Sequence, residues 1–488
     1  MFPIENPVIW ADVPDPSIVR VGDTYYMTST TMHMNPGVPI MKSTDLIHWQ
    51  LVGYAYDTLD PDNPALNMEQ GQDAYGAGSW ASSIRYVNGI FYVSTFAKTT
   101  NKTYIFSTAD IEAGQWKSAI IDGALHDSSL LFDEGRVYLV YGNSDIRIVE
   151  LDKTASRILP GGLQQRLIKK AELVAGPDFL LGAEGSHIQK IDGYYYLSLI
   201  CWPLNGMRTQ LIYRSKSLTG PYEGRVAFQH RGIAQGGLVE TNAGRWYGFL
   251  FRDAGAVGRM PYLIPVRWED GWPLYDLRGE RPAAYTQMPG SSRVEGIVTS
   301  DEFSQDTLPL QWQWNHNPDA SGWSLSERPG FLRLINRRLS SGITHTRNTL
   351  TQRTFGPTSE ASVAMDVSGM KDGDTAGLGL LQKDYGFVGV THDGGKSFVV
   401  MRLGNLEVTR LPLQTDRIYF RTRADFRDQL DQAQFFYSLD GENWQPIGDT
   451  LQMDYTLPHF MGYRFALFNF ATRTPGGQVD FDFFRVTR

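Results

Sequence analysis

One short pattern recurs five times before residue 250: a turn with Gly or Asp, then a strand-like run rich in aromatic residues. The copies are VGDTYYMTST, VNGIFYVSTF, DEGRVYLVYG, IDGYYYLSLI and NAGRWYGFLF. By subtraction, their matching tyrosines are 66, 46, 58 and 51 residues apart, at Tyr26, Tyr92, Tyr138, Tyr196 and Tyr247. This is the size of a four-stranded propeller blade. An apolar residue stands eight positions before each tyrosine, so every copy also has an earlier strand, at Ile18, Ile84, Leu130, Ile188 and Val239. The repeat predicts a five-bladed β-propeller.

A second domain follows the repeats, because 488 residues exceed what one hydrophobic core usually serves. The stretch PAAYTQMPGSSRVEG has the Pro, Ser and Gly content of a linker. Beyond it, runs such as GFLRLIN, SVAMDVSG and FVGVTHD alternate apolar and polar residues, as half-buried strands do. We therefore expect an all-β chain with a propeller at residues 1–296 and a β-sandwich at residues 297–488.

Charge and cysteine content exclude several classes of protein. The net charge of -8 comes from scattered acids, and no Lys/Arg cluster offers a surface for nucleic acid or an anionic membrane. The single cysteine, Cys201, excludes an internal disulfide and is expected to be a small buried residue. The opening MFPIENPVIW has no leader pattern, so we expect a cytoplasmic protein as given, or a secreted or periplasmic one if a leader was removed. The oligomeric state is not predicted.

Residues that enter the innermost strands of a propeller converge at one end of its channel. Eleven positions before the tyrosines stand Asp15, Ala81, Asp127, Gly185 and Gly236, and twelve before stand Pro14, Trp80, His126, Glu184 and Gln235. Three carboxylates fall in this ring. Neighbouring strand positions face opposite ways, so Asp15 and Glu184 share a side only if a strand entrance slips by one residue. Asp12 falls outside the ring, and we interpret it as a turn or hydrogen-bonding residue.

Three converging acids fit either a calcium site or carboxylate acid/base catalysis, since the sequence has no phosphate loop, His-Glu-x-x-His or cysteine cluster. A calcium cage wants further oxygen ligands closely spaced along one loop, and none is evident. Glycoside hydrolysis needs one protonated and one ionised carboxyl, and a third charge helps to separate their pKa values. The ring therefore favours a glycosidase.

The segments WADVPDPSIVRVGDTYY, HDSSLLFDEGRVYLVYG and EGSHIQKIDGYYYL resemble the three catalytic segments of glycoside hydrolase family 43. This family contains β-xylosidases and α-L-arabinofuranosidases on a five-bladed propeller. The similarity continues through SWASSIRYVNGIFYV, AQGGLVETNAGRWY, GAVGRMPYLIPVRWEDGWP and the C-terminal QWQWNHNPD and SERPGFLRL. It implies that the sandwich is of the concanavalin A type.

The resemblance also implies roles for the three acids. Asp15 becomes the general base that activates water, Glu184 the general acid, and Asp127 the residue that tunes and orients that acid. Family members invert the anomeric configuration. Inversion requires room for a water, so the two catalytic carboxyls should stand about 6.5–9.5 Å apart.

Four further residues are expected to bind substrate. Trp80 could form an apolar wall for a sugar, and Arg259 in AVGRMPY matches an arginine that family members point at the terminal sugar. The loop with His33 is expected at the pocket rim, and Gln235 lies in the ring. Many relatives hold calcium in the channel with a histidine where this chain has Ala234. A structural Ca²⁺ bound by Gln235 or His187 therefore stays open, and the chemistry requires no cofactor.

The resemblance predicts an exo-acting, inverting glycosidase that releases terminal β-D-xylose or α-L-arabinofuranose from xylan- or arabinan-derived oligosaccharides. Dual activity is expected, because a pocket with few polar contacts discriminates such isomers weakly. Two alternatives remain open. One is an endo-arabinanase with an open groove, against which the extra sandwich argues. The other is a non-catalytic sugar-binding propeller, which the three intact acids disfavour.

Overall fold

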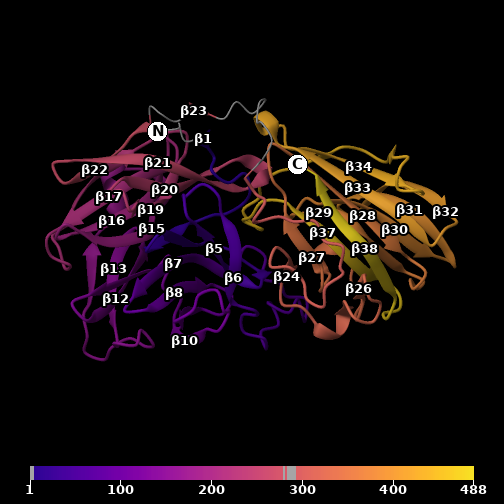
Figure 1. Ribbon diagram of the computed structural model, residues 1–488, viewed down its shortest axis with the longest axis horizontal. Coiled ribbons are helices and arrows are strands. Elements are labelled where there is room, and N and C mark those ends of the chain that lie inside the picture. Colours follow the sequence, from indigo (N-terminus) through magenta and orange to yellow (C-terminus); the bar gives the residue numbers. More distant parts are fainter. Residues whose placement is uncertain (1–4, 278–280, 283–292, 488) are drawn as a thin grey trace.

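The computed structural model describes residues 5–277, 281–282 and 293–487, which form two β-rich domains that lie side by side (Figure 1). Most of the predicted linker PAAYTQMPGSSRVEG lies outside the described residues. Helical structure in the described part is limited to single 3₁₀ turns, η1 (Ala171–Ala175), η2 (Gly255–Val257), η4 (Ala320–Gly322), η5 (Ile343–His345) and η6 (Arg427–Gln429). No described helix is long and apolar enough to cross a membrane.

The N-terminal domain consists of five four-stranded antiparallel sheets, so the predicted five-bladed propeller is confirmed. Blade one contains β2 (Ser17–Val21), β3 (Thr24–Thr28), β5 (Gly37–Ser43) and β6 (Gln50–Tyr56). Blade two contains β7 (Ser79–Val87), β8 (Ile90–Ala97), β9 (Lys102–Thr108) and β10 (Lys117–Asp122). Blade three contains β11 (Ser129–Asp133), β12 (Arg136–Asn143), β13 (Asp145–Leu151) and β14 (Gln164–Ile168). Blade four contains β15 (Phe179–Ile191), β16 (Tyr194–Pro203), β17 (Thr209–Ser215) and β18 (Glu223–Phe228). Blade five contains β19 (Ala234–Glu240), β20 (Trp246–Asp253), β21 (Arg259–Glu269) and β22 (Trp272–Tyr275).

The five repeated tyrosines all lie on the second strand of their blades, and the five apolar partners lie on the innermost strands. Blade five differs in register. Tyr26 pairs with Val19, seven residues earlier, whereas Tyr247 pairs with Val239, eight residues earlier. The turn between β19 and β20 spans residues 241–245, in place of the two-residue turns of the other blades. The longer turn shifts the strand positions of blade five by one relative to its tyrosine.

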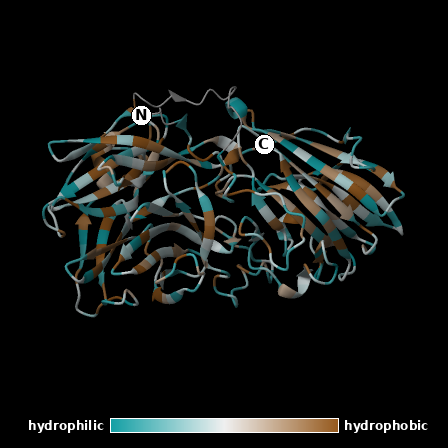
Figure 2. Cartoon of the chain, in the orientation of Figure 1, coloured by the Kyte–Doolittle hydropathy of each residue, from teal (hydrophilic) through white to brown (hydrophobic). Residues whose placement is uncertain are grey.

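The C-terminal domain is built from two eight-stranded sheets, which confirms the predicted sandwich. One sheet contains, in spatial order, β32 (Leu406–Leu413), β31 (Lys396–Leu403), β30 (Gly386–Asp393), β29 (Asp374–Leu381), β37 (Arg464–Ala471), β27 (Leu350–Arg353), β24 (Gln313–Asn315) and β4 (Met34–Asn35). The other contains β25 (Trp323–Ser324), β26 (Leu332–Ile335), β38 (Gln478–Thr487), β28 (Thr358–Asp366), β33 (Arg417–Asp425), β34 (Gln432–Ser438) and β35 (Gln445–Pro446), with β36 (Leu451–Gln452) paired to β34. Brown and teal alternate along many of these strands in Figure 2, as expected for strands with one buried face.

The two domains share one hydrophobic core. Strand β4 comes from a loop of blade one but pairs with β24 at the edge of a sandwich sheet. A single cluster of buried residues runs from Trp10 of the propeller to Phe355 of the sandwich. The predicted boundary between residues 296 and 297 stays a prediction, with Gly296 bridged to Gln50 of blade one and Asp301 bridged to Phe484. A short parallel pair joins β1 (Glu5–Asn6) to β23 (Arg281–Pro282). The rigid attachment of the sandwich allows its loops to take part in a propeller site.

Candidate active site

Asp15 lies just before β2, and its side chain is held by two donors. The Thr30 hydroxyl Oγ1 donates to Asp15 Oδ2 at 2.5 Å, and Arg259 Nη1 lies 3.1 Å from both carboxylate oxygens. Both residues are deeply buried, with Asp15 5% and Arg259 2% exposed. A buried carboxylate with fixed donors has one orientation, so Asp15 presents its oxygens to the site in a constant direction.

Arg259 is the first residue of β21 and connects Asp15 to the sandwich. Its Nη2 donates to the Phe460 carbonyl at 3.3 Å, and its guanidinium lies 4.4 Å from the centroid of the Phe460 ring. Burial by itself would lower the pKa of Arg259, but the surrounding acidic groups, Asp15 first among them, together outweigh burial and raise that pKa. Arg259 is therefore a permanent cation beside Asp15.

The other two predicted acids meet at a histidine. His126 Nε2 lies 2.8 Å from Glu184 Oε2 and 3.5 Å from Asp127 Oδ2. Asn143 Nδ2 also donates to Glu184 Oε2, at 2.6 Å, and the Gly185 backbone N–H donates to Asp127 Oδ2 at 3.0 Å. One nitrogen or oxygen from each of His126, Asp127 and Glu184 lies within 4.8 Å of the others. We call these three residues the acid cluster.

The acid cluster retains a proton near neutral pH. Burial raises the pKa of Asp127 to about 7, with the Glu184 and Asp15 charges adding to the rise and His126 opposing it. Burial tends to lower the pKa of His126, but Asp127 and Glu184 outweigh it and raise that pKa. Adjacent buried carboxyls cannot all ionise at low cost, so at least one carboxyl of this site holds its proton at a pH where an isolated carboxyl would have lost it.

The strand entrances explain how acids in neighbouring ring positions come together. Asp15, Asp127 and Gln235 have φ values of 53°, 46° and 54°, and Gly185 has 70°. Residues with these φ values adopt the left-handed conformation, which is sparsely populated and breaks the alternation of side chains along a strand. The pairing of β15 with β16 also shifts register on both sides of Glu184. The one-residue slip anticipated from the sequence is therefore present.

The left-handed conformation at the start of blade five shows that one predicted ring position was wrong. Counting from the tyrosines put Gly236 in the slot of Asp15, but the residue with the matching backbone conformation is Gln235. The longer turn of blade five causes the offset. The Gln235 side chain packs on Gly185, where an added Cβ would lie 2.8 Å from it. Gln235 thus lies beside the acid cluster, as expected from the ring, and only glycine fits at position 185.

Trp80 lies on the blade-two side of the site. Its ring is 6.0 Å from His126 and 5.5 Å from Phe460, measured between centroids. Lys98 Nζ lies 3.7 Å from the centroid of the same ring. Trp80 therefore lies between the acid cluster and Phe460, which belongs to a loop of the sandwich. This is the position expected for an apolar wall.

His33 does not lie where the sequence predicted it. The ring is 1% exposed and packs against Tyr75, His316 and His459, at centroid distances of 4.7, 4.8 and 6.0 Å. The loop that carries His33 continues into β4 and is drawn into the sandwich sheet, so it forms the domain interface in place of a pocket rim. A bound sugar cannot reach a ring enclosed in this way.

Asp12, the acid that falls outside the predicted ring, has a structural role. Its Oδ1 accepts from the Arg259 backbone N–H at 2.7 Å, and its Oδ2 accepts from the Gly462 N–H at 3.0 Å. It therefore fixes both Arg259 and the sandwich loop that contains Phe460. This agrees with its interpretation as a hydrogen-bonding residue.

The propeller channel does not fit a calcium ion. Its centre is filled by Arg85, whose Nη2 donates to Ser129 Oγ and the Ile188 carbonyl at 2.9 Å, while Nη1 donates to the Ile84 carbonyl at 2.7 Å. Burial lowers the pKa of Arg85 to about 10, so the guanidinium remains charged at neutral pH. The cavity left beside Arg85 and His187 is about 10 Å³, enough for one water at most. A divalent ion with 6–8 oxygen ligands would be crowded and repelled there.

Sequence reasoning missed four residues of the site. His126 was counted in the ring but given no role, and its position next to Asp127 was the available signal. Asn143, Thr30 and Phe460 carried no signal, because their contacts depend on how distant segments fold together.

Residues 4–273 match the sequence profile of glycosyl hydrolases family 43. Residues 300–487 match the beta xylosidase C-terminal concanavalin A-like domain. The chain belongs to glycoside hydrolase family 43. It is therefore an enzyme of the glycosidase class, as the sequence predicted.

Curated relatives and solved structures resemble this chain over two thirds or more of its length. A beta-xylosidase of Formosa agariphila is 30% identical over 98% of this chain and 89% of the relative. A non-reducing end alpha-L-arabinofuranosidase of Bacteroides ovatus is 31% identical over 67% of this chain and 64% of the relative. A solved structure described as a bifunctional GH43-CE protein of Bacteroides eggerthii is 53% identical, with a TM-score of 0.96. That match covers 99% of this chain but 64% of the other chain, so this chain spans less than two thirds of it.

Proposed function

We propose that this family 43 enzyme is an exo-acting, inverting glycosidase that releases terminal β-D-xylose or α-L-arabinofuranose from xylan- or arabinan-derived oligosaccharides. One observation carries the proposal: the acid cluster, in which burial raises the pKa of Asp127, and a separately oriented carboxylate, Asp15, lie at the same end of the propeller. The names of the xylosidase and arabinofuranosidase relatives support the choice of pentoses.

In this proposal Glu184 is the general acid. Its Oε2 is occupied by Asn143 and His126, so Oε1 is the oxygen free to carry the proton to the leaving group. As that proton departs, a raised pKa on His126 favours the imidazolium, which stabilises the carboxylate that forms. Asp127 acts through Glu184, as a neighbouring charge that keeps a proton in the cluster.

Asp15 is the general base in the same scheme. Arg259 and Thr30 fix its carboxylate, which removes a proton from a water as the water attacks the anomeric carbon. The acid and base act on opposite sides of the sugar ring, and the single displacement inverts the anomeric configuration. No step requires a metal.

The sandwich loop favours exo action over cleavage within a chain. Phe460 contacts both Arg259 and Trp80, so one side of the site is closed by a residue from the second domain. A site closed on that side accepts the end of a chain better than its middle. Release of internal fragments from linear xylan or arabinan would instead support the endo-acting alternative.

Hydrolysis of aryl pentosides tests the proposal and the two roles together. Wild type should cleave nitrophenyl β-xyloside or α-arabinofuranoside. The activity of Glu184→Ala should be about 100-fold or more below that of wild type when nitrophenol is the leaving group. The loss should be much smaller with dinitrophenol, which leaves without protonation. Asp15→Ala should lose activity equally with both leaving groups. Failure of wild type to cleave either sugar would support the sugar-binding alternative, and equal losses in Glu184→Ala would contradict the acid assignment.

A further inference from the structure

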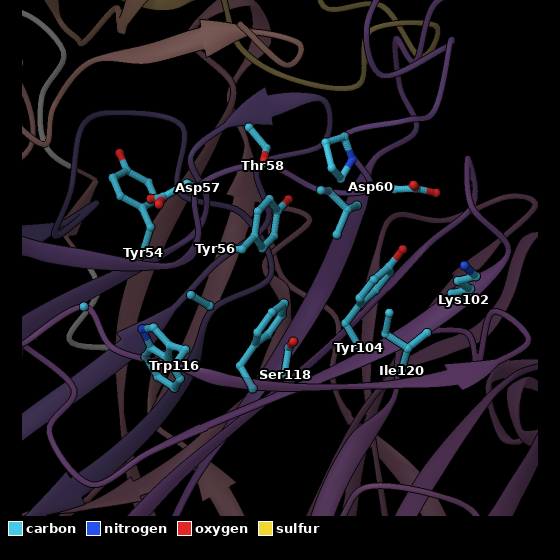
Figure 3. Close-up of a pocket in the computed structure, with 15 residues that line it drawn as sticks. Tyr54, Tyr56, Asp57, Thr58, Asp60, Lys102, Tyr104, Trp116, Ser118 and Ile120 are labelled. Atoms are coloured by element: carbon cyan, nitrogen blue, oxygen red, sulfur yellow. The ribbon is translucent and has the colours of Figure 1, made fainter. Parts of the chain in front are cut away.

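A second cavity lies on the outer wall of the propeller, between blades one and two (Figure 3). Its volume is about 430 Å³, within the range of small-molecule pockets. Strand β6 of blade one forms one side, and strands β9 and β10 of blade two form the other. We call this cavity the side groove.

The walls of the side groove are aromatic. Tyr56 and Phe106 stack with centroids 5.7 Å apart and an interplanar angle of 28°. Tyr104 and Phe106 are nearly parallel, at 6.3 Å and 6°. Trp116 is only partly buried, so part of its ring is open to the side groove, although the indole nitrogen itself is covered by protein atoms. Flat rings suit sugars, whose C–H faces stack on them.

Charged groups stand at both ends of the side groove, and Asp60 and Lys102 form the end farther from Trp116, which we call the polar end (Figure 3). Figure 3 shows Trp116 and Tyr54 at one end, Asp60 and Lys102 at the other, and Tyr56 and Tyr104 between them. Asp57 is exposed, and Asp60 is partly exposed. The side groove thus has an extended apolar floor with hydrogen-bonding groups at its ends, and it carries both signs of charge, which suits a neutral polyhydroxylated chain.

The side groove is linked to the catalytic site by a single turn. Lys98, which stacks on Trp80, begins the turn between β8 and β9. That turn leads within four residues to Lys102 in the side groove, and the Tyr104 hydroxyl donates to Thr100 Oγ1 in the turn at 2.8 Å. Strand β9 begins where the innermost strand β7 begins, so the polar end of the side groove faces the same end of the propeller as the acid cluster.

We propose that the side groove binds a segment of a pentose polysaccharide, such as a xylan backbone, as a site separate from the catalytic pocket. This inference rests on the proposed function for the choice of ligand. An exo-acting enzyme releases one residue at a time from long chains. A second site that holds such a chain raises the effective concentration of chain ends near the catalytic pocket.

Binding measurements test this site apart from catalysis. In a Glu184→Gln background, which removes turnover, Trp116→Ala should weaken binding of xylohexaose or soluble xylan about fivefold, the loss expected for one aromatic contact. The same Trp116→Ala change in the active enzyme should leave kcat/KM on nitrophenyl pentosides unchanged and lower it on xylan. Trp444→Ala, a partly buried tryptophan of the sandwich, serves as the matched control and should change neither.

Three outcomes would overturn the proposal: unchanged xylohexaose binding in Trp116→Ala, an equal loss in Trp444→Ala, or equal binding of cellohexaose, which would show a site without preference for pentoses. A linear arabino-oligosaccharide in the same assay identifies which pentose chain is bound. If wild type cleaves nitrophenyl pentosides while Trp116→Ala binds normally, the side groove proposal fails and the proposed function stands. If wild type cleaves no pentoside, the proposed function fails, and the binding result still decides the side groove.

Discussion

Asp127 combines deep burial with two neighbouring carboxylates and a histidine, and its proposed role depends on that combination. Its pKa of about 7 means that the acid cluster releases its proton near neutral pH. Above that pH Asp127 adds a negative charge to the acid cluster, which disfavours proton donation from the cluster's acid form, so activity should fall on the basic side of the optimum.

Replacement of Asp127 by Asn tests this electrostatic role. The substitution removes a like charge beside Glu184, so the proton leaves the cluster more easily and the basic limb of the kcat/KM profile should move to lower pH. We expect kcat to fall about 100-fold at the optimum. A profile recorded from pH 4 to pH 9 with an aryl pentoside measures both effects. A basic limb that stays in place would show that Asp127 does not tune the acid.

The sequence could place the three acids in one ring, because Asp15 and Asp127 stand eleven positions, and Glu184 twelve positions, before a repeated tyrosine. Their exact partners could not be predicted. Asp often adopts positive φ in ordinary turns as well, so residue type alone does not mark the left-handed strand entrances at Asp15, Asp127 and Gln235. His33 was misplaced for a related reason, since nothing local shows that its loop joins the sandwich sheet.

The loop between β36 and β37 is the element that joins the second domain to the active site. Asp12 holds this loop through Gly462, and Phe460 covers Arg259 and Trp80. Arg259 in turn orients Asp15, so the loop affects the proposed base although it contacts the base only through Arg259.

Phe460→Ala should therefore lower kcat/KM on nitrophenyl pentosides about tenfold, because water reaches the Arg259–Asp15 pair and its interaction weakens. The melting temperature should change little, since one partly enclosed ring is removed from a loop. Phe483→Ala, on the sandwich strand β38, is the matched control and should leave kcat/KM unchanged. Full activity in Phe460→Ala would show that the sandwich does not contribute to the catalytic site.

The innermost strand β7 contains Arg85, whose guanidinium is the cation of the propeller channel. Because Arg85 saturates three acceptors and fills the channel, a chelator such as EDTA should change neither activity nor melting temperature. Arg85→Met should lower the free energy of unfolding by about 2 kcal/mol or more, since it leaves buried acceptors unpaired. Loss of activity with EDTA that added Ca²⁺ restores would contradict this account and would point to a metal outside the channel.

Element order was the most predictable part of the fold. Turn residues and aromatic strands repeat at blade length, so five blades could be counted from the sequence alone. The offset in blade five was not predicted, because residues 241–245 lengthen one turn without changing the spacing of the aromatic residues. The pairing of β4 with β24 was also hidden, since it joins segments nearly 280 residues apart.

The molecule as a whole depends on an interface that contains three neutral histidines, His33, His316 and His459. Burial lowers the pKa of His316 and of His459 to about 3, and it lowers the pKa of His33 well below its usual value. These depressed values mean that the unfolded chain binds protons that the folded chain cannot. The histidines cost no stability above about pH 6.5, and stability is lost as pH falls from there toward 3.

Below pH 6, each of these histidines should make the free energy of unfolding fall by up to about 1.4 kcal/mol more for each pH unit. Urea denaturation at several pH values between 7.5 and 4.5 measures the slope. His459→Phe keeps a ring stacked on Tyr75 and should flatten the slope, whereas His48→Phe, at an exposed position, should not. An unchanged slope in His459→Phe would show that the interface does not set the acid limit of stability.

Catalysis by inversion is the central claim for the whole molecule, since it unites Asp15 and Glu184 in one mechanism. The first sugar anomer released from an aryl β-xyloside, or from an aryl α-arabinofuranoside if that is the better substrate, can be followed by proton NMR before mutarotation. A single displacement predicts that α-xylose, or β-arabinofuranose, appears first. First appearance of the anomer with the substrate's own configuration would show retention and would contradict the assignment of Asp15 as a base that activates water.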